Sequence, residues 1–335
     1  MRGILKLGVA AVALAVGVLG ARTSHALVDD PFTSYTQPAN ALVMPFDATT
    51  GHQTFLLVSN VAGISSSGIG GVTTHWSFWS DSCDHLGDVA ICLTLNDTVV
   101  VDPTKVQAID AGNNGIGPII NLSGNRGFLT VTAYDTDETC GDPSIEGFTL
   151  VDDAIVGTVT FASTVTGASS GNDAIGLGTD PTNSFTDLPD FLLSPSSTSG
   201  FLDIQTFNPE TLDNSIVVLI GVKELAGKLA GEVGPVTSSI TANANFVDNT
   251  EVSTSLPDVK FSCALFSSLI PGADNLIPDT VSVLSSGIYR LTNIQNGSKP
   301  VGGSASGGND TFVYGIHGQA VGQFGGSSNA KYSVL

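Results

Sequence analysis

Residues 126–134 read RGFLTVTAY, and this stretch decides the fold class. Leu129, Val131 and Ala133 alternate with other side chains, which is the period-two pattern of a strand that buries one face. The same alternation returns in other segments, most clearly at residues 73–80 and 155–161. The chain is therefore expected to be built from strands.

The composition favours the same fold class along the whole chain. Thr, Ser, Val and Gly are frequent, whereas the helix formers Glu, Lys and Arg are scarce. Segments 53–61 and 215–222 are uniformly apolar, which predicts strands buried on both faces. Short strands separated by Gly, Asn, Asp and Pro turns predict an all-β fold of antiparallel β-sandwiches. Further strands are expected at 41–46, 89–95, 98–101, 201–207, 236–247, 251–261, 287–292 and 311–317.

Composition also divides the chain into parts. A segment poor in apolar residues predicts a long connection between two β units. The Gly- and Ser-rich end of the chain predicts a flexible tail. Within that tail, Phe312, Tyr314 and Phe324 would allow an added edge strand. KELAGKLAGE, residues 223–232, predicts a short helix or a loop. The expected order is a signal peptide (1–26), an N-terminal β-sandwich unit (27–165), a connection (166–200), a C-terminal β unit (201–297) and the tail (298–335).

The first residues have the three parts of a secretory signal. Arg2 and Lys6 are basic, residues 7–20 are apolar, and residues 24–26 read Ser-His-Ala, the small-x-small spacing of a cleavage site. The alternative is a membrane anchor, but the apolar run is shorter than the roughly 20 residues that span a bilayer. We therefore expect cleavage after Ala26, no membrane span afterwards, and a secreted, cell-surface or periplasmic protein.

The charge balance limits the partners. The chain has 31 Asp and Glu against 11 Lys and Arg, a formal net charge of −20. Nucleic acid and anionic lipid are polyanions, so the charge disfavours both. Surface polysaccharide or other surface proteins are the partners left open, and the oligomeric state is not indicated. Most of the acids are Asp, which is typical of turns, although Asp-rich loops also suit calcium.

The cysteines indicate an oxidising compartment. There are four, an even number, which predicts disulfides in an exported chain. Three pairings are possible, and the local one joins Cys83 to Cys92. That pairing leaves Cys140 with Cys263, which would tie the two halves of the chain together.

One acidic segment is a candidate calcium loop. Asp135, Asp137, Thr139 and Glu146 occupy positions 1, 3, 5 and 12 of a spacing like that of an EF-hand. Cys140 stands where an EF-hand needs glycine, and the flanking helices are missing from the pattern, so an EF-hand is excluded. The segment is either a looser calcium loop or a solvated turn beside a disulfide.

A second cluster is a candidate ligand site. Trp79 is expected on the strand face opposite Trp76 and Phe78, where an exposed ring could stack on a sugar or on a partner. The alternative is that both faces are buried or that a loop covers the ring. His75 and Asp81 lie near it with other polar residues, and two histidines with carboxylates could bind a transition metal. The other members of that polar cluster are Asp84, His85 and Asp88.

Two stretches carry a resemblance. ALVMPFDATTGHQTFLLVSNVAG (41–63) and RGFLTVTAYDTDETC (126–140) resemble strands of uncharacterised secreted bacterial β-sandwich surface proteins. The resemblance covers about residues 41–140. It implies an exported β-rich fold and a surface role, and it carries over no functional residue.

No set of residues points to catalysis. A Gly-x-Ser-x-Gly match occurs at 167–171, in a Ser- and Gly-rich stretch. A serine hydrolase requires a helix directly after this motif, and the sequence that follows has no helix pattern. The leading hypothesis is a non-enzymatic surface or extracellular-matrix protein with a structural or adhesive role. The alternatives are a secreted module that binds carbohydrate or calcium, and an exported hydrolase whose site only the folded chain would assemble.

Overall fold

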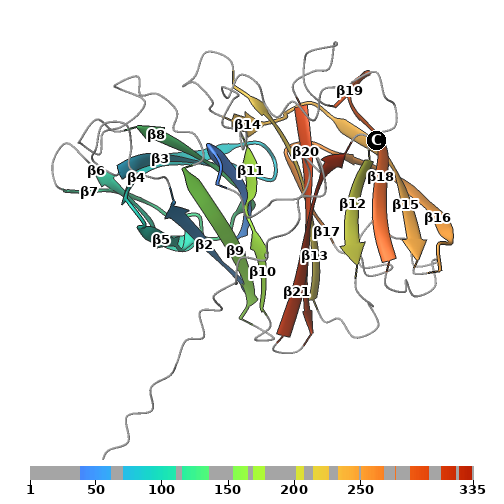
Figure 1. Cartoon of the computed structure of the whole chain (residues 1–335), viewed down its shortest axis with the longest axis horizontal. Coiled ribbons are helices and arrows are strands. Elements are labelled where there is room, and N and C mark those ends of the chain that lie inside the picture. The colour runs from blue at the N-terminus through green and yellow to red at the C-terminus, as the bar shows by residue number, and fades with distance from the viewer. Residues whose placement is uncertain are drawn as a thin grey trace, which may run out of the picture. The chain divides into compact units, whose positions relative to one another are not determined.

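The computed structural model describes residues 38–61, 71–110, 115–135, 154–164, 169–177, 201–206, 214–225, 233–248, 250–267, 276, 287–301, 311–321 and 324–333. Within these ranges the chain is an all-β protein whose strands pair antiparallel (Figure 1). The one helical element among them is a 3-10 turn, η1 (Pro103–Lys105). The predicted fold class is therefore confirmed. Residues Ser34–Leu335 form one compact unit.

The N-terminal part of the chain forms two sheets and a separate hairpin. The five-stranded sheet has the order β11-β1-β8-β3-β4, and the four-stranded sheet has the order β10-β9-β2-β5. The hairpin pairs β6 (Val106–Asp110) with β7 (Gly115–Ile120). The sheet strands are β1 (Ala41–Asp47), β2 (His52–Asn60), β3 (Gly71–Ser80), β4 (His85–Thr94), β5 (Thr98–Val101), β8 (Arg126–Asp135), β9 (Ile155–Ser163), β10 (Ser169–Asp173) and β11 (Ile175–Leu177).

The C-terminal part forms one sheet of ten strands. Eight of them follow the order β14-β13-β20-β21-β12-β18-β15-β16, while β17 pairs with β13 and β19 pairs with β18. The strands are β12 (Phe201–Thr206), β13 (Asn214–Glu224), β14 (Val233–Pro235), β15 (Ile240–Asp248), β16 (Ser253–Phe261), β17 (Ala264–Ser267), β18 (Gly287–Asn296), β19 (Lys299–Pro300), β20 (Thr311–Val321) and β21 (Phe324–Ser333).

One core lies between the two N-terminal sheets. Alternate residues of β9 are buried, beginning with Ile155, as the alternation predicts. Strand β2 alternates in the same way and leaves Phe55 exposed, so the expectation that residues 53–61 are buried on both faces is wrong. The reason is that β2 belongs to the outer, four-stranded sheet, where only one face meets another sheet.

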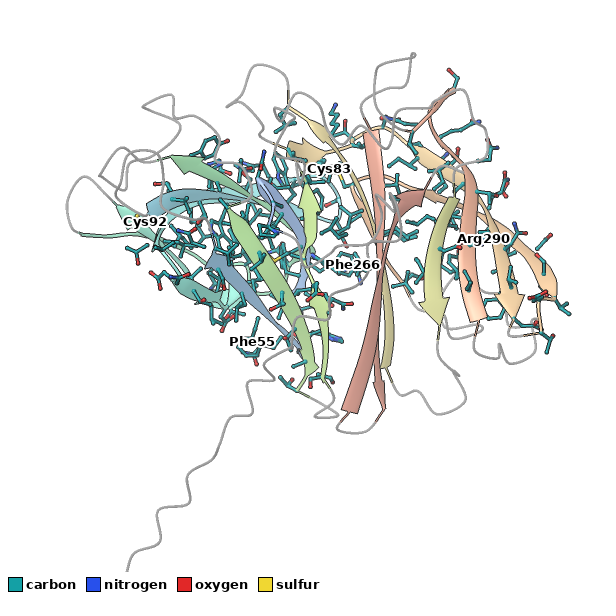
Figure 2. The ribbon with its side chains drawn as sticks, viewed as in Figure 1. Phe55, Cys83, Cys92, Phe266 and Arg290 are labelled. Carbon is teal, nitrogen blue, oxygen red and sulfur yellow. A yellow bond between two sulfur atoms is a disulfide. The ribbon has the colours of Figure 1, made fainter. Side chains whose placement is uncertain are left out.

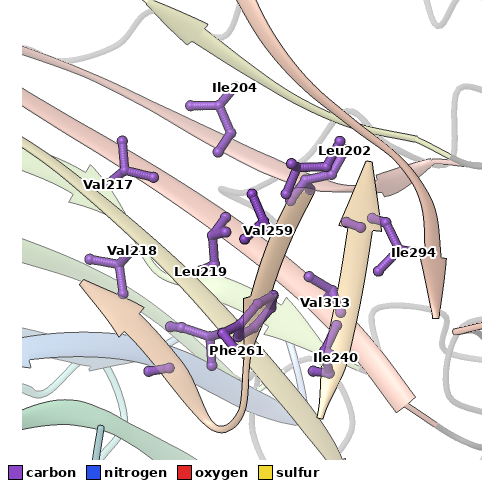
Figure 3. Close-up of a cluster of buried hydrophobic side chains, with 14 of the residues drawn as sticks. Leu202, Ile204, Val217, Val218, Leu219, Ile240, Val259, Phe261, Ile294 and Val313 are labelled. Atoms are coloured by element: carbon purple, nitrogen blue, oxygen red, sulfur yellow. The ribbon is translucent and has the colours of Figure 1, made fainter. Parts of the chain in front are cut away.

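The five-stranded sheet, apart from its edge strand β4, is instead buried on both faces. All seven residues of β1 are buried. Leu42, Met44 and Phe46 join the core between the N-terminal sheets, whereas Ala41 and Val43 join a second core. That second core is built mainly on the ten-stranded sheet, around side chains such as those labelled in Figure 3. The five-stranded sheet therefore contributes to both cores of the protein.

Two segments differ from their predicted organisation. Residues 169–177, inside the expected connection, form β10 and β11. The Gly- and Ser-rich tail contributes β20 and β21, which lie inside the ten-stranded sheet rather than at its edge. Backbone hydrogen bonds pair β20 with β13 and β21 with β20, and they need no apolar side chain. Lys223 and Glu224 of the expected helix end strand β13, and residues 226–232 lie outside the described ranges.

Gly127 marks a position where the backbone tolerates no side chain. It pairs with Ser80 of β3, and a Cβ at Gly127 would overlap the carbonyl oxygen of Trp79 and the backbone of Ser80. Gly127→Ala is expected to lower the free energy of unfolding by about 3 kcal/mol, because a backbone neighbour cannot move aside cheaply. Gly171→Ala is the matched control, since its Cβ would lie 3.7 Å from the nearest atom. Equal urea midpoints for the two variants would contradict this prediction.

Tyr289 places a hydroxyl in the second core. The side chain is fully buried, and its hydroxyl has no hydrogen-bond partner within the described ranges. Burial accordingly raises the pKa of Tyr289. Tyr289→Phe is expected to raise the free energy of unfolding by about 1 kcal/mol, because the variant no longer buries an unsatisfied polar group. Urea denaturation measures the change, and a loss of stability instead would show that the hydroxyl has a partner.

Candidate functional site

Trp79, Asp81 and His85 lie at the tip of the β3–β4 hairpin. Trp79 and His85 are paired in register, and their ring centroids are 4.6 Å apart. Trp79 packs against the second core, and its Nε1 is buried with no hydrogen-bond partner in the part of the chain that is described. The packing is that of a side chain at the margin of a core, so the ring does not stand free on the sheet as an open stacking platform would.

The polar residues near Trp79 form separate pairs. The Arg126 guanidinium donates a hydrogen bond from Nε to the Asp81 carboxylate over 2.7 Å, and His85 Nε2 lies 2.8 Å from the Asp88 carboxylate. His75 is buried further along β3, beside Thr132 of β8 in register. Within the described ranges, no three His, Cys, Asp or Glu side chains come together as metal ligands would. The structure thus divides the predicted metal cluster among separate contacts, and Asp84, its remaining member, accepts a hydrogen bond from the Ser82 hydroxyl over 3.1 Å.

Arg126 was not identified as a candidate from the sequence, yet it joins two parts of the fold. Besides Asp81, its guanidinium lies 5.3 Å from the ring centroid of Phe266, on β17 of the ten-stranded sheet. Nearby, the Thr130 hydroxyl donates a hydrogen bond to the carbonyl oxygen of Val233 over 3.0 Å. Basic residues are scarce in this acidic chain, and that scarcity is the one sequence signal that distinguishes Arg126.

The candidate calcium loop lies almost wholly outside the described ranges. Asp135 is the last residue of β8, and its backbone pairs with Val72. Asp137, Thr139 and Glu146 fall outside what the structure describes. The calcium hypothesis for this segment therefore stays a prediction.

Elsewhere the Asp residues build turns through one repeated contact. In Asp47-Ala48-Thr49, Asp102-Pro103-Thr104 and Asp248-Asn249-Thr250, the carboxylate accepts hydrogen bonds from both the backbone N–H and the hydroxyl of the threonine two residues later. These contacts close Asx turns.

The Asp248 turn gives a pH dependence with a defined sign. Its carboxylate accepts hydrogen bonds from the Thr250 hydroxyl, the Val252 N–H and the Thr250 N–H at 2.7–2.9 Å, which lower the pKa of Asp248 below its ordinary value of 3.8. The stabilisation is present above pH 3.8 and is lost as the pH falls through the lowered pKa. We expect the Val252 amide NMR signal to titrate with a midpoint below 3.8, and this titration to vanish in Asp248→Ala. A midpoint at or above that value would contradict the turn's role.

The structure corrects the predicted disulfides. Cys83, which is labelled in Figure 2, is bonded to Cys263 across a sequence separation of 180 residues, and the two Cα atoms are 5.4 Å apart. The predicted local pair, Cys83 with Cys92, is wrong because β4 is extended: Cys83 lies in the turn at the hairpin tip, whereas Cys92 pairs with Thr73 near the open end. The strand from His85 to Cys92 spans about 24 Å at roughly 3.4 Å per residue, and a disulfide needs Cα atoms within about 7 Å.

The second disulfide is only partly described. Cys92 is disulfide-bonded, and its partner is outside the described ranges. With Cys83 and Cys263 paired to each other, Cys140 cannot be bonded to Cys263 as predicted. The sequence has four cysteines, so elimination predicts that Cys140 pairs with Cys92. Both cysteines of the first disulfide have a positive φ, 76° for Cys83 and 54° for Cys263, which places each at a tight turn between two strands.

Comparisons with known proteins add no family assignment. Neither the models of known protein families nor the curated proteins contain a match to this chain. None of the helices in the described ranges has the length and apolar character needed to cross a membrane.

Proposed function

We propose that this chain is an exported, non-enzymatic protein of the cell surface or extracellular matrix, with a structural or adhesive role. The observation that carries the proposal is the Cys83–Cys263 disulfide. Disulfides persist in oxidising compartments and are rare in the cytosol, so a covalent tie between distant parts of a fold fits a protein that works outside the cytoplasm. The signal-like first 26 residues support the same conclusion from independent evidence.

The fold supports the structural role over the binding-module alternative. Trp79 is packed at the margin of a core, so its ring does not offer an open stacking surface to a sugar. Two core clusters, a covalent bridge between distant turns and a strongly acidic composition support the proposal of a structural role outside the cytoplasm. The resemblance of residues 41–63 and 126–140 to secreted surface proteins agrees with this role.

Cell fractionation with peptide mapping tests the proposal. We expect the protein outside the cytoplasm, with Leu27 as its first residue. Non-reducing peptide mapping should recover Cys83 linked to Cys263, and Cys92 linked to Cys140. Cytosolic protein that keeps residues 1–26 and has reduced cysteines would overturn the proposal.

A further inference from the structure

The two cysteines of the Cys83–Cys263 disulfide lie in different surroundings. Cys263 is fully buried and belongs to the second core. Its backbone is held on both sides, because its N–H donates to the carbonyl oxygen of Val236 over 2.9 Å and its own carbonyl oxygen accepts from the Gly221 N–H over 2.8 Å. Cys83 is only partly buried and packs against the margin of the same core. Solvent therefore reaches this pair of residues at Cys83 and not at Cys263.

This difference decides which sulfur an external thiol can attack. In thiol–disulfide exchange a thiolate bonds to one sulfur of the disulfide, and the other sulfur leaves as a thiolate. Attack on Cys263 would bring a charged thiolate into the core, where its charge is not hydrated. Attack on Cys83 keeps the incoming thiolate at the surface, but it makes Cys263 the leaving group. Apolar surroundings disfavour the thiolate form of a buried cysteine, so Cys263 leaves slowly.

The surface beside Cys83 also carries uncompensated negative charge. Asp84 is the next residue in the chain and is exposed, and its carboxylate accepts a hydrogen bond from the Ser82 hydroxyl over 3.1 Å. Asp81 forms an ion pair with Arg126, whereas Asp84 has no ion-pair partner among the described residues. A carboxylate beside the target sulfur repels an approaching thiolate, and it repels a thiol with further negative charges more strongly.

We propose that small thiols react with this disulfide at the Cys83 sulfur, that anionic thiols react most slowly, and that Cys263 then restores the bond. In the forward step, a thiolate RS⁻ bonds to Cys83 Sγ, the Cys83–Cys263 bond breaks, and its electron pair leaves on Cys263 Sγ. In the reverse step, Cys263 Sγ attacks Cys83 Sγ and expels RS⁻. Full reduction needs a second RS⁻, which attacks the mixed disulfide, forms RSSR and leaves Cys83 as a thiolate.

The fold favours the reverse step over full reduction. The hydrogen bond from the Thr130 hydroxyl to the Val233 carbonyl oxygen joins the same parts of the protein without the disulfide. Cys263 therefore stays beside Cys83 after the bond breaks, and a group held at its target has an effective concentration far above that of a free thiol. The fold thus keeps the bond closed on a protein that meets small thiols outside the cytoplasm.

Reduction kinetics of the purified mature chain test the proposal. The oxidised protein is treated with cysteamine, 2-mercaptoethanol or glutathione, quenched with acid, alkylated and mapped by mass spectrometry. We expect the mixed disulfides on the Cys83 peptide and the alkylating group on Cys263. At equal thiolate concentration, glutathione should react most slowly and cysteamine fastest. Loss of the bond should be at least about tenfold faster in urea than in the folded protein, because unfolding exposes both sulfurs.

Two single variants compare the sulfurs directly. In Cys263→Ala no thiol remains to restore the bond, so Cys83 should react readily with a thiol reagent and keep the adduct. In Cys83→Ala the remaining thiol is buried, so Cys263 should react at least about tenfold more slowly. Thermal unfolding checks the fold of each variant. If either does not fold, the peptide map of the wild-type protein still identifies the sulfur that is attacked.

Asp84→Asn tests the role of charge. This variant should raise the rate with glutathione by about twofold or more, and the gain should disappear at high salt. Asp97→Asn is the matched control, because it removes the same charge in the turn at the other end of β4. Its rate with glutathione should stay close to that of the wild-type protein.

Three results would each overturn the proposal. They are mixed disulfides on Cys263 as often as on Cys83, reduction of the folded protein as fast as in urea, and equal rates with glutathione in Asp84→Asn and Asp97→Asn. The proposal deepens the structural role proposed above and rests on it. Because the kinetics are measured on purified protein, their failure is distinct from a failure of export.

Discussion

Deleting residues 311–335 is expected to abolish the cooperative folding of the ten-stranded sheet. Strand β20 pairs with β13 over ten residues and β21 pairs with β12, so the hairpin β20–β21 is the link between the two halves of the sheet. Without it, β13 keeps only β14 and β17 as partners. Residues 217–220 of β13 are fully buried, and one side of the strand would lose its hydrogen bonds.

Strands β12 and β18, on the other side of the deleted hairpin, keep contacts with each other but lose part of their core packing. Arg290 of β18 forms two hydrogen bonds of 2.7 Å to the Asp203 carboxylate of β12, and these survive the deletion. Leu202 and Ile204 of β12, however, would lose Gly315, whose position lies directly against their side chains. The remaining strands are therefore expected to expose apolar surface and to aggregate or to fluctuate.

Urea denaturation followed by circular dichroism and tryptophan fluorescence measures the effect. The control is deletion of residues 334 and 335 alone, which should leave the transition unchanged. A single cooperative transition in the chain that ends at residue 310, within about 1 kcal/mol of the full-length value, would contradict the assignment of the tail to the sheet.

The strands were predictable because side-chain alternation is local. Residues 155–161 alternate as any strand with one buried face does, and β9 has the expected inward and outward pattern. Whether a strand also packs against a second sheet on its other face depends on distant parts of the chain, not on its own residues. Segments 53–61 and 126–134 each have five apolar residues in nine, yet β8 is buried on both faces and β2 on one. Position within the layers, set by distant pairings, decides that difference.

The tail was misjudged for a related reason. Gly and Ser are common in flexible segments, and nothing in FGGSSNAKYS suggests an interior strand. Sheet pairing, however, uses backbone groups, and β20 and β21 need only to lie between strands that already have unpaired edges. At Gly315 the strand also packs closely, because a Cβ there would lie 2.8 Å from the end of the Ile204 side chain, which would have to shift. Composition alone cannot separate such a strand from a linker.

The candidate site was predicted only in part, because its residues are brought together by pairing across the fold. The sequence placed Trp79, Asp81 and Cys83 near one another, and the hairpin tip confirms that neighbourhood. It could not indicate that Arg126 would bind Asp81, or that Cys263 would lie beside Cys83, since both partners are distant in sequence. Disulfide connectivity depends on the folded topology and cannot be read from spacing.

The second large effect on stability is expected from removal of the Cys83–Cys263 disulfide. The double variant Cys83→Ala/Cys263→Ala is expected to lower the free energy of unfolding by about 2–5 kcal/mol. The bond closes a loop of 180 residues, for which the loss of entropy in the unfolded chain corresponds to about 5 kcal/mol in the chain-entropy model. The measured decrease in the free energy of unfolding should lie near the lower end of this range if residual structure already restricts the unfolded chain.

The matched control is Ser82→Ala, which alters the same hairpin tip without removing the covalent bond. The Ser82 hydroxyl donates to Asp84 at 3.1 Å in an exposed position, so this variant should change stability by less than about 0.5 kcal/mol. A cost below about 1 kcal/mol in the double variant would show that noncovalent contacts, such as Thr130 with Val233 and Arg126 with Phe266, suffice to hold these parts together.

Proteolysis separates the covalent contribution from those noncovalent contacts. One cut between Cys140 and Cys263 leaves two fragments that the Cys83–Cys263 disulfide still joins, because this bond spans the cut and the expected Cys92–Cys140 pair does not. On a non-reducing gel the wild-type fragments should run as one species, and those of the double variant as two. If unreduced wild-type fragments separate, Cys83 is not bonded to Cys263. The covalent argument for an oxidising compartment would then rest on Cys92 alone.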